Sequence, residues 1–498
     1  MNPSLGPPLA IQNLRFTFPP VGDSPAEPLF TGLEYSLSEQ ARGVILGGAD
    51  AGKTTLARIC ANLVPRFTGG TLSGTIFFGD RNAMEVAPFD AVESIGLVFQ
   101  DPDEQIFTTR CDTEIAFALE SLGFARTEME KRIANSLDFM GLLEFRPRNP
   151  ATLSGGEKKR LLIACLAAID PQFWMLDEVF QELDATWKLQ LLQHLSAGSR
   201  TALFFDSRWS PLYASRCGNF AVLRDGVISS LAADMNPTAR ETLLAKQGLC
   251  LSSEEAGPRQ VPERGEPFIK AEGLFFQFGA AGSFDLAIDS LQLERGSVCA
   301  LVGRNGSGKS TLGKLLCGLL APARGTISLN EGGRFRHASG HELHSAIGYL
   351  FQNPDYQVFL PTVSEELAFG LRAAGIVEAQ ARDRVAEAIR LFRLPAGGTP
   401  PALMSYGARK RLQAATFHLL GRAILILDEI DAGLTYGEFL PIVELLASSG
   451  AGIVIVTHDI ALARRVCGRI IWIEGGRITR DLVPDGFSSL DALAGETV

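Results

Sequence analysis

Short, continuously apolar runs alternate along the chain with amphipathic segments. Three of these runs in the second half are Val298–Val302, Ala423–Leu427 and Gly452–Val456. Runs of about four to eight such residues are typical of strands that are buried on both faces of a mostly parallel sheet. The segment Ser310–Leu320 follows the first run and has apolar positions at helical spacing. The pattern therefore predicts an α/β fold.

The chain contains the same series of motifs twice. Gly-Lys ends at Lys53 and again 256 residues later at Lys309, and Leu-Asp-Glu starts at Leu176 and 251 residues later at Leu427. A nearly constant offset between unlike motifs predicts two homologous halves. We assign these halves, and the Pro-, Gly- and charge-rich linker between them, to residues 1–235, 266–498 and 236–265. Within the linker range, Pro237–Leu251 has an alternative interpretation as a short helix that packs on the first half.

A phosphate-binding loop is predicted in the second half, at Gly303–Ser310, which fits G-x-x-x-x-G-K-[ST] between a strand and a helix. Small residues let successive backbone N–H groups turn inward and bind an anion, and the helix N-terminus adds partial positive charge. Lys309 can then reach the outer phosphates of ATP, and the Ser310 hydroxyl can ligate Mg²⁺. The ATP-binding residues expected here are Gly303, Asn305, Gly306, Ser307, Gly308, Lys309, Ser310 and Thr311.

The first half has an altered copy of this loop at Gly47–Thr54. Asp50 occupies the place of Gly306, and a carboxylate beside bound phosphates is electrostatically unfavourable. A residue other than glycine is also disfavoured there if the backbone needs a positive φ. The ATP-binding residues expected from this copy are Gly47, Gly52, Lys53, Thr54 and Thr55.

Adjacent acids follow a predicted strand in each half, at Asp177-Glu178 after Phe173–Leu176 and at Asp428-Glu429 after Ile424–Leu427. An aspartate at a strand end can hold Mg²⁺, and the next glutamate can orient or deprotonate an attacking water. The pair is a weak signal alone but a strong one downstream of a phosphate loop in both halves.

Composition narrows the function further. Of 498 residues, 46% are apolar and 20% charged, which excludes a wholly disordered chain. The net charge of −10 disfavours nucleic-acid binding, which depends on neutralising phosphates. No apolar run approaches the roughly 18 residues of a membrane span. The eight Cys form no Cys-x-x-Cys pair, and we expect reduced core cysteines in a cytosolic protein.

Three side-chain clusters have competing interpretations. His337, His341 and His344 have spacings that would align them on one helix face and could bind a metal ion, but a solvated loop is preferred. The basic clusters Lys158–Arg160 and Arg409–Arg411 are predicted to be surface residues at the starts of helices, in preference to contacts with lipid or nucleic acid.

Leu153-Ser-Gly-Gly-Glu157 resembles the signature of the nucleotide-binding subunits of ABC transporters. The resemblance covers nearly the whole chain, once per half. It implies two tandem P-loop ATPase domains, each with a mostly parallel sheet core, an antiparallel β part and a helical subdomain. It also implies that Gln100 and Gln352 contact Mg²⁺ or the γ-phosphate and the transport partner, and that His458 is the switch histidine. Phe18 and Phe278 match the aromatic residue that stacks on adenine, although core packing is an equal alternative for both.

The motif Phe-Gln-x-Pro-Asp-x-Gln-x-Phe, at Phe99–Phe107 and Phe351–Phe359, narrows the resemblance. Together with the acidic segments Thr113–Phe117 and Glu365–Phe369, it is similar to the ATPases of energy-coupling factor transporters. These ATPases drive uptake of vitamins and transition-metal ions. The similarity implies a transmembrane scaffold subunit, a substrate-binding membrane subunit, and a peripheral position on the cytoplasmic face of the cell membrane.

Three alternative functions are each disfavoured by an observation. The fused ATPase of a monosaccharide importer has similar length but is disfavoured by the motif. A soluble twin-ATPase acting on ribosomes or nucleic acid is disfavoured by the acidic chain and the short linker. A nucleotide-binding interaction module without turnover is disfavoured by one complete set of consensus ATP-site motifs, which the two halves supply together.

The resemblance also implies that the halves pair head-to-tail, so that each ATP lies between one phosphate loop and the other half's signature. Site one would comprise Lys309, Ser310, Gln352, Asp428, Glu429, His458, Ser154, Gly155, Gly156, Glu157 and Asp184, all matching consensus. Site two would comprise Lys53, Thr54, Asp50, Gln100, Asp177, Glu178, Ser207, Tyr406, Ala408 and Thr435. The main departures are Tyr406 and Ala408 in the signature, Ser207 in place of the switch histidine and Thr435 in place of Asp184.

Because the departures fall in one site, we predict one catalytic site and one degenerate site that binds ATP but hydrolyses it slowly. An open alternative is that site two is merely slower, with Glu178 still an effective base. The expected catalytic residues are Glu429, His458, Gln352 and Glu178, and the expected Mg²⁺ ligands are Ser310, Gln352, Asp428, Thr54, Gln100 and Asp177.

Overall fold

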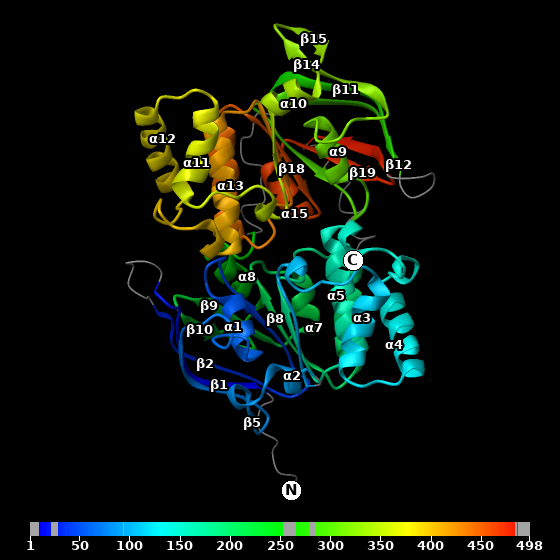
Figure 1. The fold of residues 1–498 in the computed structure, drawn as a ribbon, viewed down its shortest axis with the longest axis vertical. Helices are drawn as coiled ribbons and strands as arrows, with labels where there is room; N and C mark the ends of the chain where they lie inside the picture. The colour runs from blue at the N-terminus through cyan, green and yellow to red at the C-terminus, as the bar shows by residue number, and fades with distance from the viewer. Residues whose placement is uncertain are drawn as a thin grey trace. The chain divides into compact units, whose positions relative to one another are not determined.

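The chain divides into two compact units, one ending at Cys250 and the other starting at Leu251 (Figure 1). A computed structural model describes residues 9–20, 28–92, 94–251, 265–277, 285–483 and 486. Within these residues each unit has a four-stranded antiparallel sheet, a six-stranded mostly parallel sheet and a group of three long helices. This architecture confirms the predicted tandem α/β fold.

The six-stranded sheet of the first unit has the order β10-β9-β3-β8-β7-β6, and the antiparallel sheet has the order β2-β1-β4-β5. Only β10 runs antiparallel to its neighbour in the larger sheet. The strands are β1 (Leu9–Thr17), β2 (Pro28–Leu37), β3 (Arg42–Leu46), β4 (Thr71–Phe78), β5 (Arg81–Asn82), β6 (Ile95–Val98), β7 (Phe173–Asp177), β8 (Thr201–Asp206), β9 (Asn219–Arg224) and β10 (Val227–Ser230). The α-helices are α1 (Lys53–Cys60), α2 (Pro88–Ala91), α3 (Cys111–Ser121), α4 (Arg126–Phe139), α5 (Gly155–Ile169), α6 (Ala185–Ala197), α7 (Pro211–Arg216) and α8 (Pro237–Lys246).

The second unit repeats this topology, with the orders β16-β17-β18-β13-β19-β20 and β12-β11-β14-β15. Its strands are β11 (Glu266–Gln277), β12 (Asp285–Arg295), β13 (Val298–Val302), β14 (Arg324–Glu331), β15 (Arg334–His337), β16 (Ile347–Leu350), β17 (Ile424–Asp428), β18 (Gly452–Thr457), β19 (Arg469–Glu474) and β20 (Arg477–Leu482). Its α-helices are α9 (Lys309–Leu316), α10 (Gly340–Ala346), α11 (Val363–Ala373), α12 (Glu378–Leu391), α13 (Tyr406–Leu420), α14 (Tyr436–Ser448) and α15 (Ile460–Val466).

The central strands are apolar because both faces of the sheet are covered. Every residue of β13, β17 and β18 is buried, as the continuous apolar runs predicted. The helix predicted to reach Leu320 ends at Leu316, because Gly318 has a φ of +80° and turns the chain out of the helix. Among the described residues, no helix is long and apolar enough to cross a membrane.

Each unit sets its helical group beside the sheets. In Figure 1, α3, α4 and α5 (cyan) stand side by side in the first unit, and α11, α12 and α13 (yellow to orange) do so in the second. The helices α5 and α13 begin at the signature segment and its altered copy, so the sequence motifs lie at the start of this group.

The first unit extends into the range expected to be linker. Helix α8 lies in that range, and its Leu244 is fully buried. The Arg240 guanidinium lies 4.8 Å from the ring centre of Trp209 and 4.7 Å from that of Phe220, and the backbone N–H of Trp209 donates to the Leu249 carbonyl at 2.7 Å. Of the expected linker 236–265, the part up to Cys250 therefore belongs to the first unit, and residues 252–264 lie outside the described residues.

We expect Leu244→Ala to lower the free energy of unfolding of the first unit by about 2–5 kcal/mol, the cost of removing a buried leucine side chain. Urea unfolding followed by tryptophan fluorescence measures this, since Trp209 packs against α8. Thr242→Ala, on the exposed side of the same helix, is the control and should change little. Equal effects from the two substitutions would show that α8 is not part of the folded unit.

Candidate active sites

The phosphate loop of the second unit has the backbone that its glycines predict. Gly306 and Gly308 have φ values of +79° and +102°, which L side chains rarely adopt. A Cβ on Gly303 would lie 2.1 Å from the Ile473 carbonyl oxygen, so only glycine fits there. The Lys309 ammonium is buried and donates to the carbonyls of Gly303 and Arg304 at 2.8 and 3.0 Å. The lysine therefore lies folded along the loop that is predicted to bind phosphate.

This loop and the strand beside it provide groups suited to a phosphate and a divalent cation. The Ser307 hydroxyl is buried and has no hydrogen-bond partner among the described residues. The Ser310 hydroxyl donates to Asp428 Oδ1 at 2.8 Å, and the Tyr349 hydroxyl donates to Asp428 Oδ2. Burial, together with the neighbouring charge of Glu429, raises the pKa of Asp428 to about 6. A cation bound here would relieve that cost, so the oxygen ligands fit Mg²⁺.

Glu429 is held beside His458 at the carboxyl end of β17. Its backbone N–H donates to the Val456 carbonyl at 3.0 Å, and its φ of +47° is unusual for a residue other than glycine. Its Oε1 lies 3.8 Å from His458 Nδ1. Burial raises the pKa of Glu429, but His458 and the ammonium of Lys309 outweigh it and leave that pKa below its usual value. Glu429 is therefore ionised and paired with an imidazole.

The first unit brings the equivalent groups together in a different arrangement. The Lys53 ammonium donates to the carbonyls of Gly47 and Gly48, both at 2.8 Å, and pairs with Glu178 Oε1 at 3.1 Å. The Thr54 hydroxyl donates to Gln100 Oε1 at 3.4 Å. The lysine and the candidate base thus neutralise each other inside the first unit.

Two further residues decide how well the first unit's site suits a nucleotide: Asp177 favours Mg²⁺ binding, and Asp50 makes the phosphate loop differ from that of the second unit. Asp177 has an Oδ1 without a hydrogen-bond partner among the described residues, and burial raises its pKa to about 6. An orphaned carboxylate oxygen fits Mg²⁺ as Asp428 does. Asp50 is exposed and its backbone lies outside the left-handed region that Gly306 occupies, so the two loops differ in shape as well as charge.

Glu178 is enclosed on both oxygens. The Ser207 backbone N–H and hydroxyl donate to its Oε2 at 3.1 and 3.0 Å, while Lys53 holds Oε1. Only 3% of the Glu178 side chain is exposed, compared with 16% for Glu429. The serine at the switch position therefore points to the candidate base and helps to close it off.

A buried polar network that the motifs did not reveal surrounds this pair. Asp206 accepts hydrogen bonds from the Tyr213 hydroxyl at 2.6 Å and from Gln181 Nε2 at 2.5 Å. Burial and the charge of Glu178 raise the pKa of Asp206 to about 8. Asp206 aligns with Thr457 of the second unit, which is the one signal in the sequence: an acid at the end of an apolar strand where the repeat has a neutral residue.

The signature segment of the first unit is a helix N-terminus. Ser154 caps α5, and the Ser154 backbone N–H in turn donates to the Glu157 carboxylate at 2.8 Å, which completes a capping box. In the altered copy Ser405 still caps α13, but Ala408 cannot return the bond. Gly155 and Gly156, the first two residues of α5, occupy its first turn.

The exchange of Asp184 for Thr435 preserves a local role. Asp184 caps α6 by accepting from the Trp187 N–H at 3.3 Å. Thr435 caps α14 and forms a capping box with Glu438. Both residue types are good N-caps, so this departure leaves helix stability intact.

The prediction that the basic clusters are surface residues is wrong for three of their members. Lys159 and Lys410 are fully buried and Arg160 is 9% exposed. Lys159 donates to the carbonyls of Phe99 and Gln100 at 2.9 and 2.5 Å, and the Arg160 guanidinium covers the Trp187 ring. Carbonyl oxygens compensate the buried charge, and a sequence does not show where such oxygens will lie.

The second glutamine of the repeated motif fixes the segment behind the first. Gln105 accepts from the Phe99 N–H at 3.1 Å and donates to the Leu97 carbonyl at 2.9 Å. Gln357 makes the same two contacts, with the Phe351 N–H at 3.2 Å and the Tyr349 carbonyl at 2.8 Å. The second glutamine of the motif therefore holds the loop that carries Gln100 or Gln352 in place.

Buried carboxylates fix the other end of the motif and leave aromatic rings exposed. Glu114 accepts from the N–H groups of Phe107 and Thr108, and Glu366 accepts from those of Phe359 and Leu360. The rings Phe107–Phe117 and Phe359–Phe369 pack edge to face, at 4.7 and 5.6 Å, and all four are at least half exposed. Each unit therefore presents one exposed aromatic pair.

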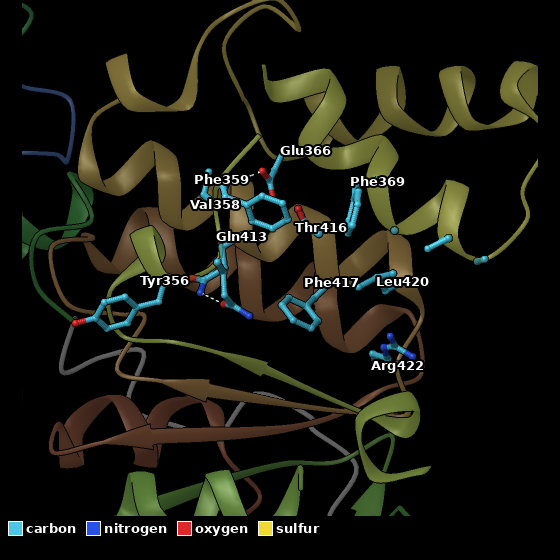
Figure 2. A pocket seen from close by; sticks show the side chains of 14 residues that line it. Tyr356, Val358, Phe359, Glu366, Phe369, Gln413, Thr416, Phe417, Leu420 and Arg422 are labelled. Carbon is cyan, nitrogen blue, oxygen red and sulfur yellow. Dashed lines mark hydrogen bonds between the residues drawn. The ribbon is translucent and has the colours of Figure 1, made fainter. Parts of the chain in front are cut away.

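In the second unit this pair lines a groove of about 580 Å³ between the motif and helices α11 and α13. Figure 2 shows Phe359, Phe369 and Phe417 along the groove, with Tyr356 toward one end and Arg422 toward the other. The groove is mostly apolar and open, which suits a protein segment that carries apolar side chains.

The remaining candidates have mixed outcomes. Phe18 is 42% exposed and packs edge to face on Phe16, so it is not a core residue, and its contact with adenine stays a prediction. Phe278 lies outside the described residues. The loop preferred for the three histidines is wrong, because His337 ends β15 while His341 and His344 lie on α10, although all three are exposed as expected. No metal-binding group of three side chains is found in the part of the chain that is described.

Two P-loop units with strand-end carboxylates define a class: a tandem nucleotide-hydrolysing protein. The ABC transporter family model matches residues 30–181 and 286–432. A "Putative ABC transporter ATP-binding protein" of Caldanaerobacter subterraneus subsp. tengcongensis is 30% identical over 483 residues, covering 87% of this chain and 84% of the relative. The chain belongs to the ABC transporter ATP-binding family, and it is an ABC-type ATPase that binds and hydrolyses ATP.

Two other similarities also cover most of the chain. The "Putative HMP/thiamine import ATP-binding protein YkoD" of Bacillus subtilis (strain 168) is 28% identical, over 96% of this chain and 91% of the relative. A solved structure named RNase-L Inhibitor has a TM-score of 0.59 and 18% identity, over 96% of this chain and 93% of that one. At that identity the likeness shows the fold alone.

We expect Asp206→Asn to remove a pH dependence of stability. A carboxyl whose pKa is raised in the folded state keeps a proton that the unfolded chain releases, so wild-type stability falls as the pH rises from about 4 to about 8, by at most about 1.4 kcal/mol per pH unit. Urea unfolding at pH 5.5 and 7.5 should show this fall in wild type and a smaller one in the variant.

The exposed Asp138→Asn is the matched control and should keep the wild-type pH dependence. If Asp206→Asn also kept it in full, Asp206 would be ionised in the folded chain, and the buried network would not hold a proton.

Proposed function

We propose that this chain is the energy-coupling ATPase of an importer of the energy-coupling factor type, with one hydrolytic and one degenerate ATP site. The observation that carries the proposal is the difference between the two candidate bases. Glu429 is partly exposed and paired with His458, whereas Glu178 is enclosed by Lys53 and Ser207. A general base must reach the water from which it takes a proton.

The proposal includes head-to-tail pairing of the two units, as the family resemblance implies. Site one then combines the phosphate loop, Gln352, Asp428, Glu429 and His458 of the second unit with residues 154–157 and Asp184 of the first. In site two, the altered loop of the first unit meets the altered signature of the second. Mg²⁺ supplies charge neutralisation at the phosphates when it is bound. Its proposed ligands are Ser310, Gln352 and Asp428 in site one and Thr54, Gln100 and Asp177 in site two.

In site one, different groups of the chain bind the phosphates and accept the proton of the attacking water. Lys309 and the loop N–H groups bind and orient the outer phosphates. Glu429 accepts the proton of the attacking water, and His458 holds the carboxylate ionised. In site two, Lys53 must leave Glu178 before it can serve a phosphate, which favours slow turnover.

Glu429→Gln should reduce steady-state ATPase activity about 100-fold or more, because the amide cannot accept the proton. Glu178→Gln should leave most of the activity, because Glu178 is already neutralised by Lys53. The measurement is phosphate release at saturating ATP for both variants and wild type.

Ser154→Arg adds a test of the pairing, because it alters the first unit but should damage the site carried by the second. We expect a loss as large as that of Glu429→Gln. Equal losses from Glu429→Gln and Glu178→Gln would contradict the one-site proposal.

The membrane partners proposed are a transmembrane scaffold subunit and a substrate-binding membrane subunit. The exposed aromatic pair is built by the same motif in both units, which supports two equivalent docking positions for one scaffold. The groove beside Phe359 and Phe369 would receive an apolar helix of that scaffold. The vitamin-importer name of the Bacillus subtilis relative supports a vitamin as substrate, with a transition-metal ion as the alternative.

Phe369→Asp should lower copurification of the membrane scaffold by about tenfold or more, since a charge would be buried in an apolar contact. Phe117→Asp should do the same in the first unit. Because both rings are about half exposed, neither change should lower the melting temperature of the isolated chain.

Phe335→Asp, an exposed ring on β15 outside the groove, is the control and should keep the scaffold bound. Wild-type copurification of both aromatic variants, or copurification of wild type with ribosomes, would contradict the membrane assignment.

A further inference from the structure

Two side chains at the start of α13 hold the catalytic segments of the second unit. The Tyr406 hydroxyl donates to the backbone carbonyl of Gln352 at 3.0 Å. The Lys410 ammonium, one turn later, donates to the carbonyls of Glu429 and Ala432 at 3.2 and 2.6 Å. The same ammonium lies 4.8 Å from the centre of the Tyr406 ring.

In the first unit the equivalent glutamine carbonyl, that of Gln100, is bound without a tyrosine. Its residue at the Tyr406 position is Gly155, which has no hydroxyl to donate. There Lys159 reaches the Gln100 carbonyl at 2.5 Å, and its ammonium lies 3.6 Å from Glu182 Oε1. A tyrosine hydroxyl at Gln352 thus takes the place that a lysine ammonium takes at Gln100.

This exchange changes what the buried lysine can do. Lys410 is fully buried, so its charge must be compensated by oxygen atoms or by an aromatic face. With the tyrosine hydroxyl on Gln352, the lysine binds the carbonyl of Glu429 itself, and the Tyr406 ring covers it. Both segments that carry site-one chemistry are therefore tied to one helix start.

We infer that Tyr406 is a positioning residue for ATP hydrolysis in the second unit. Its hydroxyl fixes the backbone of Gln352, and its ring keeps Lys410 on the backbone of Glu429. Tyr406 makes the second unit's signature depart from consensus, which affects site two. The same residue thereby supports site one, because Gln352 and Glu429 belong to its own unit. This inference rests on the proposed function only in that Gln352 and Glu429 carry the hydrolysis.

The test compares Tyr406→Phe with Tyr406→Gly. Tyr406→Phe keeps the ring over Lys410 and removes one neutral hydrogen bond, so kcat should fall about three- to tenfold. The Mg²⁺ concentration for half-maximal activity should rise, because Gln352 is a proposed Mg²⁺ ligand, while KM for ATP should change less. Tyr406→Gly should lower kcat further, although it restores the consensus signature.

Tyr35→Phe is the matched control, because its buried hydroxyl has no hydrogen-bond partner among the described residues. It should leave both kcat and the Mg²⁺ requirement unchanged. A purely structural role for Tyr406 would lower the melting temperature without moving the Mg²⁺ requirement.

An unchanged kcat in Tyr406→Phe, or a higher kcat in Tyr406→Gly, would overturn the inference. The latter result is what a simple defect of site two predicts. Failure of the proposed function is separately visible, because Glu429→Gln would then keep its activity whatever the Tyr406 variants do.

Discussion

One backbone hydrogen bond in each unit determines the chemistry of the site. The N–H of Glu178 donates to the Phe205 carbonyl at 2.8 Å, and the N–H of Glu429 donates to the Val456 carbonyl at 3.0 Å. Strands β7 and β8, and β17 and β18, pair in the same register, so the candidate base always lies beside the residue just past the neighbouring strand. The strand pairing is equal in the two units, and the side chain at that position, Ser207 or His458, is one of the differences between the two sites.

The departures of the second unit are accommodated locally rather than left as defects. Ser405 and Thr435 still cap their helices, so the altered segments keep their helix starts. The Tyr406 hydroxyl donates to the Gln352 carbonyl, and the Lys410 ammonium donates to the Glu429 carbonyl. The residue that alters the signature thus also donates a hydrogen bond to the segment that carries Gln352.

Local patterns predicted much of this structure from the sequence. Buried strands, glycine-dependent loops and strand-end acids each depend on residues close together in the chain, so Val298–Val302 and the loop after it were predictable. The buried lysines were not, because Lys159 and Lys410 depend on carbonyls about 20 to 60 residues away that only folding brings near. The Asp206 network was missed for the same reason. Helix α8 matches the alternative interpretation of Pro237–Leu251 as a short helix on the first half, although composition alone favoured a linker there.

The most direct measurement is a single-turnover experiment on the whole chain with its membrane partners. The protein is loaded with ATP, free nucleotide is removed, Mg²⁺ is added, and the retained ATP and ADP are quantified after one turnover. One catalytic and one degenerate site predict that about half of the bound ATP is hydrolysed rapidly and the rest persists. Rapid hydrolysis of all bound ATP would contradict the proposal that only one of the two sites is catalytic.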